Sequence, residues 1–120
     1  MFQTGLFTKV TGYTAGEAIM KYSADGKVIG EFTVGVGGGS VKYPVMWVRV
    51  TVWEQVAEEV LKVIDRKGIA VEANGLLLVR LYEGKRGTAV AIELKDVREV
   101  RVYDKAGELV KVLSGVAKAE

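Results

Sequence analysis

Most of the chain alternates apolar and polar residues in short runs that glycine interrupts, a pattern typical of strands in a small β-sandwich or β-barrel. Successive side chains of a strand point to opposite sides, so each run predicts two distinct faces. The predicted strands cover residues 2–11, 17–22, 27–36, 43–53, 69–74, 76–83 and 88–97, and two more short strands flank a turn at residues 104–107.

The apolar period changes to that of a helix once, in residues 54–67, where Val56, Val60 and Ile64 recur at intervals of four. Glutamates gather near the start of this segment and basic residues near its end, which suits the helix dipole. We therefore predict one amphipathic helix that ends at Gly68 and covers the β-structure with its apolar side. Binding a partner is the alternative use of that side.

Three predicted strands supply most of the expected core through their alternate apolar residues. These residues are Val28, Phe32, Val34 and Val36 in the first strand, Met46, Val48, Val50 and Val52 in the second, and Val90, Ile92 and Leu94 in the third. The glycine-rich run at residues 35–40 precedes a strand instead of a helix, so we interpret it as a flexible loop and not as a phosphate-binding loop.

The second face of the strand at residues 43–53 is chemically different, because it carries Trp47, Arg49, Thr51 and Trp53. It holds both tryptophans of the chain with an arginine between them, a combination suited to stacking flat rings beside an anion. Planar bases on a phosphate chain fit that description. A sheet covered on both sides, with the two tryptophans buried, is the alternative.

A similar pairing of charge and ring recurs in residues 76–83, where Arg80 and Tyr82 share one face and Leu77, Val79 and Leu81 share the other. The hairpin tip that follows carries two basic residues, Lys85 and Arg86. Such a tip is also compatible with an ordinary solvated turn. Its nearness to Arg80 and Tyr82 favours a contact with nucleic acid.

The composition of the chain limits the classes of function that the protein can have. A chain of 120 residues with 49% hydrophobic content is sufficient for one domain, predicted at residues 1–113 with a short tail at 114–120. No run approaches the roughly 20 apolar residues that cross a bilayer, and no signal peptide is recognisable, so we expect a soluble cytoplasmic protein. The net charge of +2 is too small to be a nucleic-acid signature by itself.

The sequence contains no cysteine and no histidine, which excludes disulfides, the usual zinc sites, cysteine nucleophiles and histidine-based triads. The best candidates for acid–base chemistry are Glu17, Glu31 and Glu93, which we interpret as solvated surface charges. We therefore expect no catalytic residue, cofactor or metal, and no enzymatic activity.

Together these elements predict a mainly β protein: a five-stranded OB-fold barrel with one helix between its third and fourth strands and an extra C-terminal β-hairpin. The chain resembles bacterial-type single-stranded DNA-binding proteins. The resemblance runs over residues 9–100 and rests on the segments KYSADGKVIGEFTV, MWVRVTVWEQVAEEV, DRKGIAVEANGLL and RLYEGKRGT. The second segment is the most specific, because its tryptophan, arginine and second aromatic residue have fixed spacing before the helix.

Transferred residue by residue, the resemblance implies that Trp47, Trp53 and Tyr82 stack on bases and that Arg49 and Arg80 face the DNA. The other predicted contacts are Tyr22 before the first hairpin turn, Tyr43 in place of a loop aromatic that the glycine run replaces, and Lys42, Lys85 and Arg86 along the phosphates.

The resemblance also implies sequence-independent binding and protection of single-stranded DNA in replication, repair or recombination, by a homotetramer. The sequence ends in AKAE, without the acidic tip that recruits partner enzymes in this family. We expect either a truncated chain or a specialised relative that coats DNA without those partners. An OB-fold assembly module resembling primosomal accessory proteins and a single-stranded RNA binder remain alternative hypotheses.

Overall fold

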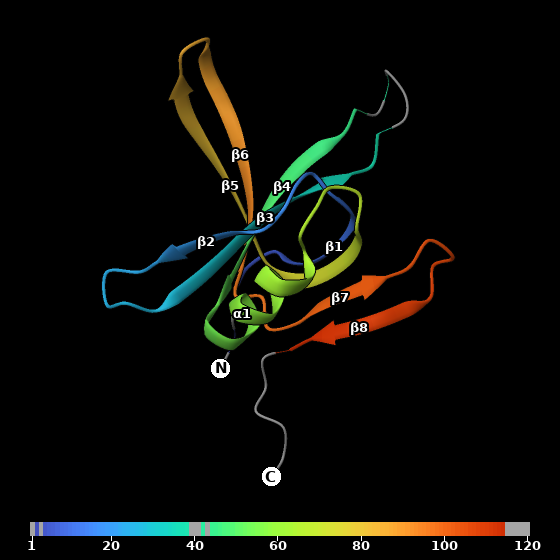
Figure 1. The fold of residues 1–120 in the computed structure, drawn as a ribbon. Coiled ribbons are helices and arrows are strands. Elements are labelled where there is room, and N and C mark those ends of the chain that lie inside the picture. Colours follow the sequence, from blue (N-terminus) through green and yellow to red (C-terminus); the bar gives the residue numbers. More distant parts are fainter. Residues whose placement is uncertain (1, 3, 39–41, 43, 115–120) are drawn as a thin grey trace.

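The computed structural model describes residues 2, 4–38, 42 and 44–114. Over these residues the chain is mainly β with one helix, as predicted (Figure 1). The elements are β1 (Phe7–Thr14), β2 (Ile19–Tyr22), β3 (Val28–Val36), β4 (Met46–Trp53), α1 (Glu54–Val63), β5 (Ala70–Gly84), β6 (Gly87–Lys95), β7 (Val100–Tyr103) and β8 (Leu109–Leu113).

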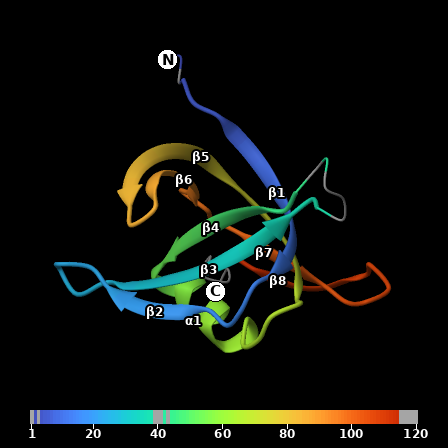
Figure 2. The ribbon, with the colours of Figure 1, turned by 90° about the horizontal axis from the view of Figure 1, so that it is seen from above.

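The strand pairings form a closed ring. Strand β1 pairs with both β3 and β5, β3 pairs with β4, and β5 pairs with β6, all antiparallel. A parallel pairing of β4 with β6 completes the ring, and α1 follows β4 and precedes β5 along the chain. Strand β2 pairs with β3, and the β7–β8 hairpin pairs with β5, so these strands extend from the ring (Figure 2).

The interior of the ring is filled by alternate apolar residues of its strands. Val34, Val50, Val52 and Leu94 are completely buried, and Val48 nearly so. Helix α1 covers this core with Val56, Ala57 and Val60. It approaches β3 closely, because a Cβ atom at Gly30 would lie 3.3 Å from Ala57. The predicted role of the helix as a cover for the β-structure is confirmed.

The helix is shorter than predicted, because it ends at Val63 and not at Gly68. The segment that follows is bound to Thr14 at the end of β1. The Thr14 hydroxyl donates to the carbonyl of Arg66 over 2.9 Å and accepts from the Ile69 amide over 3.0 Å. These bonds replace helical ones, so Gly68, with φ of +86°, belongs to the turn into β5. Among the described residues, no helix is long and apolar enough to span a membrane.

Two predicted strand ends at glycine are wrong. Strand β1 continues past Gly12, and β5 runs through Gly75 as one strand of 15 residues. A Cβ at Gly12 would lie 2.1 Å from the carbonyl oxygen of Gly35, and one at Gly75 would lie 2.4 Å from that of Lys95. Glycine therefore marks close backbone crossings here, and the strands continue through them.

The β5–β6 hairpin extends well beyond the ring, which corrects part of the predicted core (Figure 1). Strand β6 pairs with β4 only from Ile92 to Leu94. Val90 lies beyond that pairing and is exposed, as are Val79 and Leu81 on the same side of the hairpin. Met46 is exposed as well, because it lies at the outer end of β4 opposite Val36.

Candidate nucleic-acid interface

Strand β4 separates its side chains as predicted, with valines inside and both tryptophans outside. Val48, Val50 and Val52 are buried, whereas 57% of Trp47 and 45% of Trp53 are exposed. Arg49 lies between the two indoles on the outer side. Thr51 is the exception on this side, because it is buried. The alternative in which a covered sheet buries both tryptophans is therefore wrong for this chain.

The indole of Trp47 lies against the backbone of the neighbouring strand. Trp47 pairs with Gly35 of β3, and a Cβ atom at Gly35 would come within 2.9 Å of Cζ3 of the indole. Only glycine leaves room for the ring in this place. The ring is therefore supported on one side by β3, while more than half of the residue stays open to solvent.

The register of the sheet brings Arg80 and Tyr82 onto the same outer face. Directly opposed residues of paired strands point to the same side. Arg49 is opposite Glu93 of β6, and Glu93 is opposite Leu78 of β5. Arg80 and Tyr82 follow Leu78 at intervals of two, so they also point outward. We call the set Trp47, Arg49, Trp53, Arg80 and Tyr82 the outer face.

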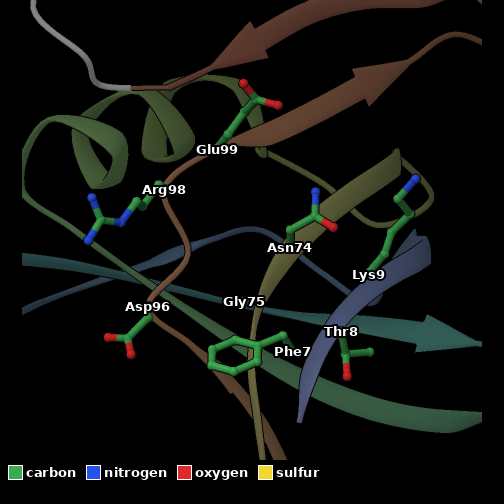
Figure 3. A pocket seen from close by; sticks show the side chains of 8 residues that line it. All are labelled: Phe7, Thr8, Lys9, Asn74, Gly75, Asp96, Arg98 and Glu99. Atoms are coloured by element: carbon green, nitrogen blue, oxygen red, sulfur yellow. The ribbon is translucent and has the colours of Figure 1, made fainter. Parts of the chain in front are cut away.

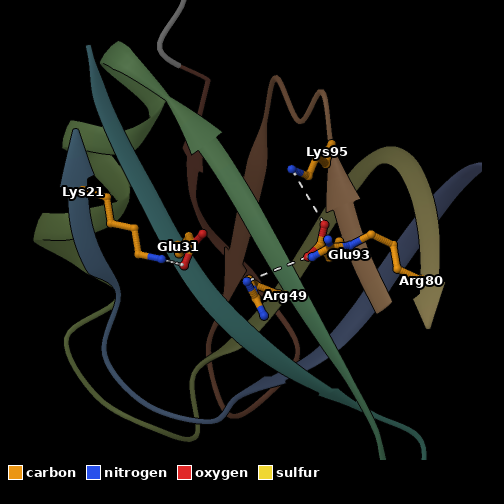
Figure 4. A network of polar contacts seen from close by, with 6 residues as sticks. All are labelled: Lys21, Glu31, Arg49, Arg80, Glu93 and Lys95. Atoms are coloured by element: carbon orange, nitrogen blue, oxygen red, sulfur yellow. Dashed lines mark hydrogen bonds and ion pairs between the residues drawn. The ribbon is translucent and has the colours of Figure 1, made fainter. Parts of the chain in front are cut away.

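At the centre of the outer face, one carboxylate binds three cations. Nη2 of Arg80 donates a hydrogen bond of 2.6 Å to Oε2 of Glu93. Nη1 of Arg49 lies 3.8 Å from the same oxygen, and Nζ of Lys95 lies 3.7 Å from Oε1 (Figure 4). Beside it in Figure 4, Lys21 of β2 and Glu31 of β3 form a separate ion pair of 2.9 Å.

Glu93 is only 4% exposed, so its interpretation as a solvated surface charge is wrong. The alternation of side chains along β6 does place Glu93 on the outer side of the sheet, but the long side chains of the three cations cover it. The hydrogen bond from Arg80 lowers the pKa of Glu93 below its ordinary value and outweighs the opposite effect of burial. Glu93 is therefore a carboxylate at neutral pH, and the cluster of three cations and one anion keeps a net charge of +2.

The arginines of this cluster remain accessible although they share a partner. The side chain of Arg49 is 46% exposed and that of Arg80 is 61% exposed. A guanidinium has five N–H donors, and the contacts with Glu93 occupy few of them. Both arginines are therefore held in place with donors still directed to solvent.

The remaining predicted contacts are not members of the outer face as defined above. Tyr22 is exposed, but it pairs with Val28 on the side of β3 that also carries Gly30 and packs against α1. Lys85 and Arg86 are exposed at the tip of the β5–β6 hairpin, and Lys42 is exposed in the loop before β4. Tyr43 lies outside the described residues.

No family model and no curated protein matches this chain. Among solved structures, the chain is similar to the crystal structure of the small single-stranded DNA-binding protein from Streptomyces coelicolor. The TM-score is 0.64, and the similarity covers 87% of this chain and 98% of the other. The two chains share one fold. At 16% sequence identity, the predicted resemblance to single-stranded DNA-binding proteins is confirmed for the fold.

The predicted contacts did not include an exposed tyrosine of β1, Tyr13. Tyr13 of β1 is 64% exposed and points outward, opposite Gly35 on one side and Ala70 on the other. The strand was predicted to end at residue 11, which left Tyr13 in a loop. Continuing the alternation of Lys9 and Thr11 by one step would have placed Tyr13 on the outer side.

A hollow of about 500 Å³ elsewhere on the fold has different chemistry (Figure 3). Two cations, Lys9 and Arg98, and two anions, Asp96 and Glu99, line it. These charges balance, so the hollow does not extend the positive charge of the outer face. Across the described part of the chain, no group of three or more acidic side chains is arranged to hold a metal ion.

Proposed function

We propose that this protein binds single-stranded DNA through its outer face, without sequence preference, and protects it. The observation that carries the proposal is the pair of open indoles, Trp47 and Trp53, with Arg49 between them on one exposed strand. In this proposal the closed ring of strands is an OB-type barrel that presents β4 to the ligand. The fold of the Streptomyces coelicolor protein supports this choice of ligand.

Stacking supplies the affinity for bases. Each base that lies on Trp47, Trp53 or Tyr82 contributes about 1–3 kcal/mol, and every base has a π face, so the contact is largely indifferent to base identity. Duplex DNA hides these faces between stacked pairs. The outer face therefore favours single strands.

Contacts with the phosphates supply the rest of the affinity for DNA. Arg49 and Arg80 are held beside the aromatic residues by Glu93, and their free N–H donors are available to phosphate oxygens. Lys85 and Arg86 at the hairpin tip, together with Lys42, extend the phosphate path. Each phosphate neutralised in this way releases counterions, so the affinity decreases as salt increases.

One OB domain covers only about 4 to 16 nucleotides, so efficient protection of DNA requires several linked domains. We propose a homo-oligomer, a tetramer by analogy with the family that the sequence resembles, acting in the cytoplasm in replication, repair or recombination. Equilibrium ultracentrifugation of the free protein and of its complex with oligo-dT tests this assembly.

The test of the binding proposal is the double variant Trp47→Ala with Trp53→Ala. Its affinity for fluorescein-labelled oligo-dT, measured by anisotropy, is expected to fall by about 2–6 kcal/mol because two stacks are lost. Met20→Ala is the control, since Met20 is exposed but lies opposite Gly30 of β3, on the side of the sheet that packs against α1. Unchanged affinity in the double variant, with the fold intact by circular dichroism, would contradict the proposal.

A role as an assembly module is the second candidate, and the exposed Val79, Leu81 and Val90 favour it. An assembly module would show little quenching of tryptophan fluorescence by oligo-dT, whereas stacking would quench Trp47 and Trp53 strongly.

Binding of single-stranded RNA is a further alternative, because stacking tolerates either backbone. Competition between oligo-dT and oligo-U at fixed salt separates a DNA binder from an RNA binder.

A further inference from the structure

A second row of aromatic residues crosses the sheet at right angles to β4 and begins at Trp47. Opposed residues on β4, β3, β1, β5 and β7 follow one another across the sheet. In that order they are Trp47, Gly35, Tyr13, Ala70 and Tyr103. Three rings thus alternate with two of the smallest residues, and all five residues point outward.

The small residues leave hollows between the rings. One hollow, of about 490 Å³, has Gly35 in its lining with Trp47 and Tyr13. The next, of about 500 Å³, has Ala70 in its lining with Tyr13 and Tyr103. Both volumes fall in the range of pockets that hold small molecules. Tyr13 lines both hollows, so they lie next to each other along the row.

The charge of these two hollows suits a polyanion, and the acidic Glu72, which accepts a 3.4 Å hydrogen bond from the Tyr103 hydroxyl, lines a neighbouring hollow and neither of these two. Lys67 lines both hollows, and Arg66 and Lys105 line the second. Neither Lys67 nor Lys105 forms an ion pair with any residue that the structure describes. The acidic residue in the lining, Asp104, accepts hydrogen bonds of 2.9 Å from the amides of Ala106 and Glu108 in its own turn.

We propose that a single-stranded DNA chain leaves the outer face at Trp47 and continues through the two hollows. Bases lie against Tyr13 and then Tyr103, and Lys67 contacts the phosphates between them. This extension rests on the proposed function, because Trp47 belongs to both paths. It makes the occluded site longer than the outer face alone and bends the strand away from β4.

The test compares short and long oligonucleotides on the full chain. An oligo-dT of about 5 nucleotides fits on the outer face, whereas one of about 15 also reaches the hollows. Tyr13→Ala is expected to weaken binding of the long oligonucleotide by about 5- to 140-fold, the equivalent of one lost stack, and to leave the short one unchanged. Tyr13→Phe keeps the ring and is expected to bind both as the parent does.

Met20→Ala is the control, because Met20 is 52% exposed and lies opposite Gly30 of β3, on the side of the sheet that packs against α1. Lys67→Ala is the second variant and replaces an exposed side chain in a turn. It is expected to lower the salt slope for the long oligonucleotide by about one unit, and to leave the slope for the short one unchanged. If Tyr13→Ala does not fold, Lys67→Ala by itself tests whether the DNA path extends into the hollows.

The outcomes separate the two proposals. If the parent binds neither oligonucleotide, the proposed function itself fails. If the parent binds both, and Tyr13→Ala and Lys67→Ala keep the parent's preference for the long oligonucleotide, the extension fails and the outer face stands. Equal losses for both lengths would also overturn the extension, because they would place Tyr13 within the primary site.

Discussion

Replacing Glu93 with glutamine removes the negative charge at the centre of the outer face and keeps the shape of the side chain. The parent carboxylate accepts a 2.6 Å hydrogen bond from Arg80 and has two longer ion pairs, with Arg49 and Lys95. We expect Glu93→Gln to destabilise the fold, because the lowered pKa shows that these contacts outweigh the desolvation of the carboxylate.

The size of the loss follows from the three contacts. A hydrogen bond to a charged group contributes about 1.5–3 kcal/mol. The two longer pairs involve cations whose side chains are each 46% exposed, so solvent screening limits them to less than about 1 kcal/mol. Burial of the carboxylate offsets part of this, and glutamine retains a neutral acceptor. The expected decrease in the free energy of unfolding is therefore about 1–3 kcal/mol.

Urea denaturation at several pH values measures this loss. A carboxyl whose pKa is lowered by folding stabilises the protein above its unfolded-state pKa of about 4.3. That contribution disappears as the pH falls through the lower pKa of the folded state. The difference in the free energy of unfolding between the parent and Glu93→Gln should therefore have its full size at pH 7. It should disappear in acid, below about pH 4.

Glu83→Gln is the control, because Glu83 lies exposed on the same hairpin and its carboxylate accepts a hydrogen bond from Thr88. We expect this change to alter the free energy of unfolding by less than about 0.5 kcal/mol. Equal stability of Glu93→Gln and parent at pH 7 would refute the reasoning. A gap that persists unchanged in strong acid would show that its cause is not the charge of Glu93.

Three further predictions follow from the contacts described. Arg49→Ala should lower the salt slope of oligo-dT binding by about one unit, measured by anisotropy at several salt concentrations, and an unchanged slope would remove Arg49 from the phosphate path. Gly75→Ala should destabilise the fold by about 2–4 kcal/mol in urea, because its Cβ would lie 2.4 Å from the Lys95 carbonyl; Gly16→Ala, with open space around it, is the control. Thr14→Val should lower the free energy of unfolding by about 1–3 kcal/mol, since it leaves the Ile69 amide without its acceptor, and unaltered stability would contradict that role.

Alternation was sufficient to predict the two sides of β4. A strand with valine at every second position has one side that must be buried, so Trp47 and Trp53 fall on the other. Exposure of the indoles then depends only on whether a second layer covers that side. Helix α1 lies on the opposite side of β3 from the indoles, which leaves them open.

Other features depend on distant contacts and were beyond pattern analysis. Gly12 and Gly75 looked like strand ends, because only the folded chain brings Gly35 and Lys95 against them. Glu93 was predicted exposed because alternation alone does not reveal the covering by Arg49 and Arg80. The roles assigned to individual residues of the outer face stay predictions until binding is measured.

The β5–β6 hairpin has a consequence for energetics. Beyond its pairing with β4 it is a two-stranded ribbon, with Arg80 and Tyr82 on one side and Leu81 and Val90 on the other. An isolated ribbon of two strands is only marginally stable in water. If DNA binds one side as proposed and a second copy of the chain binds the other, ordering of the ribbon by one partner lowers the entropic cost of binding the other. Each partner should then raise the affinity for the other by the same factor.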